Sequence, residues 1–123
     1  MQTFYYAQGD HPSEARLATA IREAIPAQAI ECFTGLESFR ERLRKPVDPD
    51  SIAVISATNL DELRRMQGLG DLLSEVFVVL VIPDRKRETI ELAHHLLPRF
   101  MSRHQDDFVD LGQVLQKIVR TPH

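Results

Sequence analysis

The chain has 123 residues, of which 43% are hydrophobic and 27% charged, and its net charge is −3. This length and composition are typical of one globular domain that can bury a core without disulfides or metal ions, so we expect a single domain over residues 1–123. The charge balance favours neither a nucleic-acid nor a membrane partner. The N-terminus lacks the basic and apolar regions of a signal peptide, and we expect a cytoplasmic protein.

The N-terminal residues predict a strand followed by a helix. Thr3–Ala7 is short, aromatic and apolar, as strands are, and Gln8–Pro12 is rich in turn-forming residues. Ser13 is of a type that caps helices, and an apolar stripe with helical spacing follows it. Pro26 is expected to end this helix.

A second unit of the same kind follows. Gln28–Phe33 predicts a strand at the edge of a sheet, because it carries polar residues. The single cysteine, Cys32, is interpreted as a small hydrophobic residue of this strand. Thr34 and Glu37 have the spacing of a capping box for a second helix. Pro46–Asp50 holds two prolines and predicts a loop.

Two further strands are apolar without interruption. Val76–Ile82 is seven apolar residues in a row, and Ile52–Ile55 is a shorter run of the same kind. Unbroken apolar strands are buried on both faces, as in a parallel sheet with helices on each side. Asn59, with Glu62 three residues later, is expected to cap the helix between them.

The C-terminal third predicts two more helices around a short strand. Asp84 is expected to cap the first of these helices, and Pro98 to end it. Phe100–Ser102 is more polar and predicts the other edge strand. Asp106 or Asp107 is expected to cap the last helix. The apolar stripes of these two helices are Ile90, Ala93, Leu96 and Leu97, and Leu111, Val114, Leu115 and Ile118.

Five alternations of strand and helix predict an α/β fold. Such alternation is typical of a parallel sheet with right-handed crossovers and helices on both faces. Because the second and fifth strands are the polar ones, we expect them at the edges. The predicted strand order is therefore 2-1-3-4-5, a flavodoxin-like three-layer αβα sandwich in which a site lies at the carboxyl ends of the strands.

The end of the third strand, Val54–Asn59, and the five strand–helix units resemble the receiver domain of response regulators over essentially the whole chain. The resemblance places Ala57 where receivers carry the phosphoacceptor aspartate. Since a methyl group can neither accept a phosphoryl group nor bind Mg²⁺, the resemblance implies a degenerate receiver that lacks phosphorylation chemistry.

The other positions of the receiver site also depart from the receiver pattern. Receivers carry an acidic pair after the first strand, whereas this chain has only Asp10 there. They end the fourth strand with Ser or Thr, where this chain has Ile82 and Pro83. Arg103, followed by His104, aligns best with the receiver lysine. The degenerate site comprises Gln8, Asp10, Ser56, Ala57, Thr58, Ile82, Pro83 and Arg103.

No other pattern indicates catalysis or a metal site. His94 and His95 are adjacent on a helix, so their side chains point about 100° apart and do not chelate one ion. Neither Ser56 nor Thr58 has a base placed by sequence to activate it, and no nucleophile is expected. We therefore expect no catalytic residue, no metal and no cofactor.

The preferred hypothesis is a phosphorylation-independent signalling module that binds another signalling protein or a second copy of itself. Receivers commonly use their fourth helix, fifth strand and fifth helix for this purpose, and the resemblance implies the same surface here. Its candidate residues are Arg87, Glu91, Leu92, His94, His95, Arg103, Asp107, Asp110 and Gln113. Leu92 is expected to be an exposed apolar anchor.

The alternative is a small ligand-binding protein or enzyme whose site lies at the strand ends. Its candidate residues are Asp10, Thr58, Asn59 and Asp84. A deep polar cavity at the strand ends favours this alternative, whereas a site filled by Ile82 and Pro83 favours the interaction module.

Overall fold

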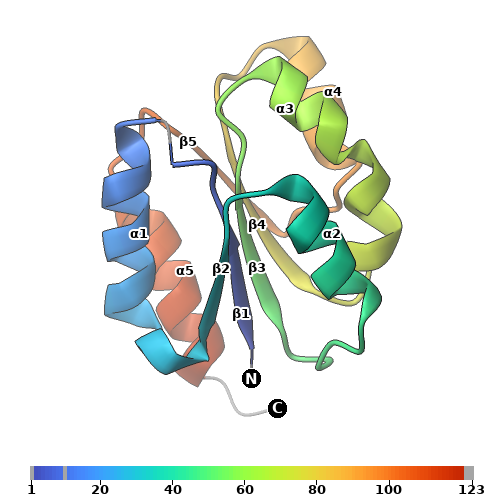
Figure 1. Ribbon diagram of the computed structural model, residues 1–123. Coiled ribbons are helices and arrows are strands. Elements are labelled where there is room, and N and C mark those ends of the chain that lie inside the picture. The colour runs from blue at the N-terminus through green and yellow to red at the C-terminus, as the bar shows by residue number, and fades with distance from the viewer. Residues whose placement is uncertain (1, 10, 121–123) are drawn as a thin grey trace.

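The computed structural model, which describes residues 2–9 and 11–120, contains one five-stranded parallel sheet in the order β2-β1-β3-β4-β5 (Figure 1). The predicted strand order is therefore confirmed, with the two polar strands at the edges. The strands are β1 (Thr3–Tyr6), β2 (Ile30–Phe33), β3 (Ile52–Ser56), β4 (Phe77–Ile82) and β5 (Phe100–Arg103).

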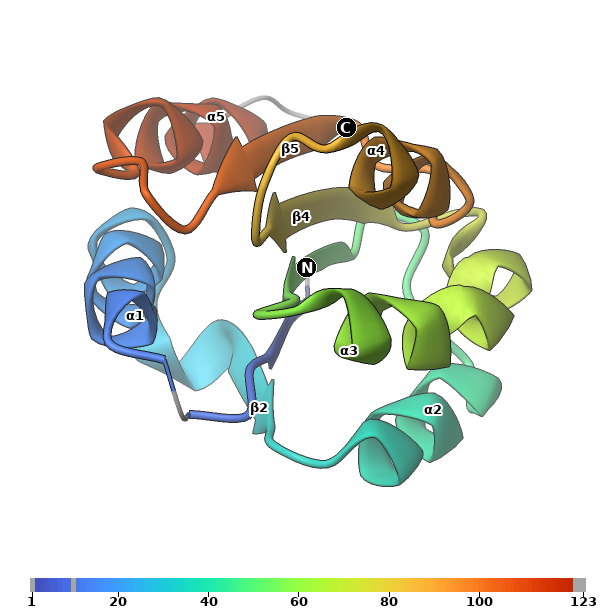
Figure 2. The ribbon, with the colours of Figure 1, turned by 90° about the horizontal axis from the view of Figure 1, so that it is seen from above.

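Helices cover both faces of the sheet (Figure 2). They are α1 (Ser13–Ala24), α2 (Leu36–Arg44), α3 (Leu60–Arg65), α4 (Arg87–His94) and α5 (Val109–Arg120). One face packs against α1 and α5, and the other against α2, α3 and α4. Short 3₁₀ segments over Ala27–Ala29 and Met66–Leu73 precede β2 and follow α3.

Each central strand contributes to two cores, because successive side chains point to opposite faces of a sheet. In β3, Ile52 and Val54 pack in the core under α1 and α5, while Ala53 and Ile55 pack in the core under the other three helices. All five residues of β3 are buried, and for Ile52–Ile55 the uninterrupted apolar run predicts this burial. At the end of the strand the alternation places Ser56 toward α1 and the following Ala57 in the opposite core.

The helix starts were predicted with mixed success. The Oδ1 atom of Asn59 accepts a hydrogen bond from the Glu62 backbone N–H at 2.8 Å, so that cap is confirmed. Ser13 is not a cap, because it is already the first residue of α1 and follows Pro12. The capping box of the second helix is also wrong. Gly35 holds the cap position there and makes no side-chain bond.

The start and end of α4 differ from the prediction. Lys86 precedes its first turn, and Asp84 lies earlier, where its Oδ1 atom accepts bonds from the Lys86 N–H and the Thr89 hydroxyl. The helix ends at His94 and not just before Pro98. Leu97 consequently leaves the apolar stripe, with a φ of 56° and 56% of its surface exposed.

Cys32 also differs from its interpretation. It lies in β2 as predicted, but its side chain is exposed, because β2 is an edge strand that the helices cover incompletely.

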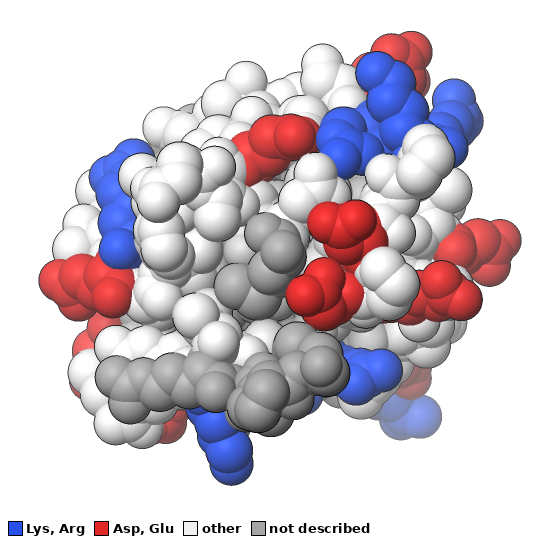
Figure 3. All heavy atoms as spheres, turned by 90° about the horizontal axis from the view of Figure 1, so that it is seen from below, with Lys and Arg blue, Asp and Glu red and all other residues white. Residues whose placement is uncertain are grey.

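None of the helices in the part of the chain described has the length and hydrophobicity that a membrane-spanning segment needs. On the face at the amino ends of the strands, acidic and basic side chains are interspersed (Figure 3). This mixture agrees with the nearly balanced charge of the sequence.

Candidate functional site

The carboxyl ends of β1, β3 and β5 meet the amino end of α1, and four buried polar side chains gather there. Their exposed fractions are 3% for Ser13, 5% for Glu14, 0% for Ser56 and 2% for His104. We call these four residues the strand-end cluster. They come from α1, β3 and the residue after β5, so the fold brings together positions that lie up to 91 residues apart.

Glu14 is the acceptor of the cluster. Its Oε1 atom accepts hydrogen bonds from the backbone N–H groups of Gly9 at 2.8 Å and His11 at 3.3 Å. Its Oε2 atom accepts a bond from the Ser56 hydroxyl at 2.6 Å. A carboxylate in the first turn of a helix also meets the positive end of the helix dipole. Three donors and this dipole compensate the burial of the carboxylate.

His104 is held on both sides of its ring. Its Nε2 atom lies 3.1 Å from the Ala57 carbonyl oxygen, and its Nδ1 atom contacts the Ser13 hydroxyl. Because a carbonyl oxygen can only accept, Nε2 carries a proton and donates it to Ala57. The Ser56 hydroxyl is 3.2 Å from the same nitrogen. His104 therefore ties the end of β5 to the end of β3.

The cluster is closed from outside by His11 and Arg16. The ring of His11 lies 4.6 Å from that of His104, centroid to centroid, and its Nδ1 atom is 2.7 Å from the Ser13 hydroxyl. Arg16 donates from Nη2 to the His104 carbonyl oxygen at 3.1 Å, and its guanidinium stacks over Phe108 at 5.7 Å. These contacts fasten the connection between β5 and α5 to α1.

This environment makes the charged form of His104 unfavourable. Burial lowers the pKa of His104 below its ordinary value, and the neighbouring His11 lowers it further. The Glu14 carboxylate acts in the opposite direction, but its effect is smaller. Burial at this position therefore favours the neutral imidazole over the charged one.

A serine, a histidine and a glutamate in contact invite comparison with a hydrolytic triad, but the order of contacts differs. In a triad the histidine lies between the nucleophile and the acid. Here the Ser56 hydroxyl lies between Glu14 and His104, and it donates its proton to the carboxylate. All three side chains are buried. The arrangement is suited to hold strand ends together rather than to attack a substrate.

The predicted degenerate-site residues are only partly brought together. Ala57 is fully buried in the core under α2, α3 and α4. Ile82 belongs to the same core, with Pro83 half-buried beside it. Gln8 is half-buried after β1, and Thr58 is half-buried and donates to Glu62 at 3.4 Å.

Arg103 and Asp10 differ from the other residues of the predicted degenerate site. Arg103 does not point into the site. It pairs with Asp106 at 3.5 Å and lines a depression between α4 and β5, while the next residue, His104, fills the strand-end position. Asp10 lies outside the residues that the structure describes.

The candidates for a ligand site serve structural roles. Asn59 caps α3, and Asp84 holds the turn before α4. The hydrogen bonds from the Thr89 hydroxyl and the Lys86 N–H lower the pKa of Asp84. In the described residues, no group of three or more His, Cys, Asp or Glu side chains could hold a metal ion.

Sequence reasoning missed the part that Ser13, Glu14 and His104 play in the strand-end cluster. The sequence suggests Ser13 as a helix cap, which places it near the start of α1 but does not predict its contacts, and no sequence pattern singles out Glu14. His104 stands out in the sequence only as the residue that follows Arg103. The available signal was the spacing of β5, since alternation that leaves Arg103 outside turns its neighbour inward.

The predicted interaction residues lie on or near the surface made by α4, β5 and α5, which we call the α4–β5–α5 surface. Arg87 and Glu91 are exposed and pair at 3.1 Å, and Asp110 is exposed on α5. Leu92 is a correction, because it is half-buried and packs against the core instead of projecting as an anchor. His94 is exposed at the end of α4.

Two depressions flank the edge strand β5 on this surface. One, of about 410 Å³, lies between β5 and α5, and the other, of about 290 Å³, lies between α4 and β5. Arg85, Met101 and Ser102 line both. Asp107 borders the first depression, but with Gln113 it also lines a separate groove between α1 and α5. The predicted residues thus belong to two neighbouring surfaces.

The C-terminal end of α4 is fastened to the 3₁₀ segment Met66–Leu73. Gln67 donates from Nε2 to the Leu92 carbonyl at 3.2 Å, and its Oε1 atom accepts from His95 Nδ1 at 2.8 Å. A Cβ atom on Gly70 would lie 2.7 Å from the His95 carbonyl oxygen. Only a glycine allows the two backbones to approach so closely.

The fold and the arrangement of its strands define a receiver-like, flavodoxin-like α/β domain. A similar solved structure, from Burkholderia thailandensis E264, is described as a "putative pilus assembly protein (cpaE)". It is 20% identical to this chain, with a TM-score of 0.63, and the match covers 98% of this chain and 100% of that one. At this identity the likeness shows the fold. No protein-family model matches the chain, and no curated protein does.

Proposed function

We propose that this chain is a receiver-like signalling module that works without phosphorylation and acts by binding another protein. The observation that carries the proposal is the buried position of Ala57 beside the strand-end cluster. Where the receiver resemblance calls for a phosphoacceptor, the chain has the buried methyl group of Ala57, and His104 donates to the carbonyl of that same residue. Phosphoryl transfer needs an accessible acceptor and groups that neutralise the developing charge.

We further propose that the module is not an enzyme and that it binds its partner in the cytoplasm through the α4–β5–α5 surface. Charged residues of both signs line the two depressions beside β5, among them Asp110 and the paired Arg103 and Asp106, and the exposed Arg87–Glu91 pair lies on α4. Paired charges at the rim of a hollowed surface favour a protein partner with complementary charges. Because the similar Burkholderia structure is described as a pilus assembly protein, components of such an assembly are the first partners to test.

The lack of phosphorylation is tested by treating the protein with acetyl phosphate and Mg²⁺ and measuring its intact mass. We expect no phosphoryl adduct. A phosphoryl adduct located on an aspartate would refute this part of the proposal. The binding surface would still have to be tested separately.

The binding surface is tested by capture from cells that express the chain, with the captured proteins quantified by mass spectrometry. The variant Arg87→Glu with Asp110→Lys reverses two charges of the surface and keeps the net charge. The variant Glu41→Lys with Arg44→Glu makes the same exchange on α2, whose contacts are at the opposite edge of the sheet. We expect the first variant, and not the second, to lose the partner. Equal capture by both variants would exclude this surface.

A further inference from the structure

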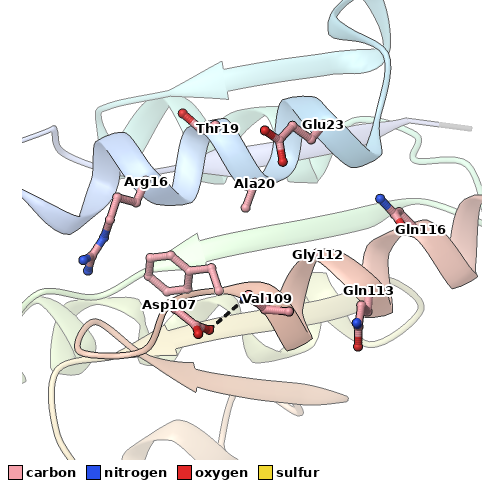
Figure 4. Close-up of a pocket in the computed structure, with 10 residues that line it drawn as sticks. Arg16, Thr19, Ala20, Glu23, Asp107, Val109, Gly112, Gln113 and Gln116 are labelled. Atoms are coloured by element: carbon pink, nitrogen blue, oxygen red, sulfur yellow. Dashed lines mark hydrogen bonds between the residues drawn. The ribbon is translucent and has the colours of Figure 1, made fainter.

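A groove of about 540 Å³ runs between α1 and α5, on the face of the molecule that lies away from α2, α3 and α4 (Figure 4). Each helix contributes one stripe of residues with the spacing i, i+3, i+4, i+7. The stripe on α1 is Arg16, Thr19, Ala20 and Glu23, and the stripe on α5 is Val109, Gly112, Gln113 and Gln116.

Small residues form the middle of the groove. Ala20 and Gly112 lie between the longer side chains that mark its two ends (Figure 4). Gly112 is inside a helix, where glycine is less stable than alanine. Its φ is not positive, and an added Cβ would meet nothing within 4 Å. The fold therefore does not require a glycine here, and the glycine leaves the middle of the groove without a side chain.

Exposed apolar surface accompanies the groove. Val109 is 55% exposed, and it is one of only two large hydrophobic residues in the described residues with so much surface in solvent. Val109 lies at the mouth of the groove, on the first turn of α5. An apolar side chain beside a row of small residues is suited to pack against another helix.

The charged residues of α1 in one copy are complementary to those of α1 in a second copy related by a two-fold rotation. Arg16 and Glu23 are exposed, seven positions apart on the same stripe, with Thr19 and Ala20 midway between them. If a second α1 lies antiparallel across the first and the two cross at this midpoint, each Arg16 meets the Glu23 of the other copy. An interface with such a two-fold axis repeats every contact twice.

The same rotation also fits α5. Two antiparallel copies that cross between Gly112 and Gln113 approach closely at the glycine, and Val109 of each copy then lies over Gln116 of the other. Side chains of Gln113 from both copies meet at the axis, where an amide can donate to and accept from its counterpart. The same two-fold rotation thus gives the apolar, amide and charged residues of both stripes a contact in the second copy.

We propose that the faces of α1 and α5 that border this groove form a self-association surface, packed against the same two faces of a second copy in antiparallel orientation. Two helices of 12 residues are about 18 Å long and present a footprint smaller than the roughly 800 Å² per partner of a standard stable interface. The dimer is therefore weak, and it forms at concentrations of about ten micromolar or more.

The test measures the average mass by sedimentation equilibrium over protein concentrations from about ten micromolar to about one millimolar. We expect the parent to pass from monomer toward dimer over this range. A parent that stays monomeric throughout would overturn the proposal. Raised salt should weaken the dimer, since exposed charges are screened.

Two charge variants give the sharpest evidence. Glu23→Arg leaves only positive charges at the two pairing positions, and Arg16→Glu leaves only negative ones. Because Arg16→Glu also removes the bond to the His104 carbonyl and the contact with Phe108, its unfolding in urea is measured alongside, and the mixture with Glu23→Arg decides the result. We expect each variant alone to associate about tenfold more weakly than the parent. Mixed together, the two variants should associate at least as well as the parent, because both cross-pairs become attractive in the antiparallel arrangement. A mixture that associates no better than its components would overturn this geometry.

A third variant, Gly112→Leu, separates the groove from folding. Leucine favours the helix and enters open space, so we expect a melting temperature at or above that of the parent, together with at least a thirtyfold loss of association. The Arg87→Glu, Asp110→Lys variant should dimerise as the parent does, which distinguishes this surface from the one proposed for the partner. A dimer that persists in Gly112→Leu and is lost in the other variant would place the interface elsewhere.

Discussion

The strand-end cluster and the α4–β5–α5 surface are neighbours in the fold, yet they treat their polar groups in opposite ways. In the cluster, Glu14 and His104 are almost fully buried, and each is held by several partners. On the surface, Arg87 and Glu91 make one exposed ion pair. Buried polar groups are costly unless they are satisfied, whereas exposed pairs contribute little to stability. The first region therefore contributes to the stability of the fold, whereas the exposed charges of the second contribute little to it, which suits the binding role proposed for this surface.

The largest effect should come from placing a charge in the buried core next to the strand-end cluster. Ala57→Asp introduces a carboxylate into a fully buried position without a partner. We expect it to destabilise the protein by about 3 kcal/mol or more, measured by urea unfolding. Ala27→Asp, in an exposed 3₁₀ turn, is the control and should have a minor effect.

The same variant also tests the receiver comparison. Because Ile82 and Pro83 offer no hydroxyl beside position 57, we expect Ala57→Asp to bind Mg²⁺ negligibly and to remain unphosphorylated by acetyl phosphate. Tight Mg²⁺ binding would show that the strand ends of this chain can still form a receiver site.

A smaller effect is expected from removing the acceptor of the cluster. Glu14→Ala leaves the Gly9 and His11 N–H groups and the buried Ser56 hydroxyl without their acceptor. We expect a loss of about 2–4 kcal/mol in the free energy of unfolding. Glu41→Ala removes an exposed glutamate from α2 and should change stability by less than about 0.5 kcal/mol. Similar losses for both would mean that the cluster does not stabilise the fold.

The pH dependence of stability gives a third effect. The pKa of His104 is lowered in the folded state from its ordinary 6.5, so below that pH the unfolded chain binds the proton first. Stability should therefore fall as the pH is lowered from about 7 to about 5, by at most about 1.4 kcal/mol per pH unit for this group.

Unfolding in urea at several pH values measures this slope. His104→Gln removes the titrating group and should flatten the curve over this range, while His94→Gln, at an exposed position, should leave the slope unchanged. If both variants keep the parent slope, another group controls the pH dependence.

The smallest effect should come from the surface. Arg87→Glu with Asp110→Lys breaks only exposed contacts, so the free energy of unfolding should stay within about 0.5 kcal/mol of the parent. Differential scanning calorimetry checks this expectation at low protein concentration. A large loss would show that the surface contributes to folding, and the contrast between the two regions would then be wrong.

The sheet order could be predicted because the signal for it was local. Val76–Ile82 and Ile52–Ile55 read as strands buried on both faces, and the polar residues of β2 and β5 marked the edges. The strand-end cluster could not be predicted in the same way. It depends on which way Ser56 and His104 point at the ends of two strands that are far apart in the sequence. The predicted caps of α1, α2 and α4 were wrong, because proline, glycine and lysine hold these cap positions instead of the expected polar residues.

The close approach of Gly70 to His95, together with the bonds of Gln67, has a consequence for the rate of partner binding. These contacts attach the end of α4 to the neighbouring 3₁₀ segment through the Gln67 side chain and through the close approach of the Gly70 and His95 backbones. If the proposed partner binds at α4, the surface of this helix is already ordered. Binding then costs little conformational entropy for ordering it. Association should proceed in one concentration-dependent kinetic phase, without a slower phase in which α4 rearranges. The amide hydrogens of α4 should exchange slowly with solvent even before the partner arrives.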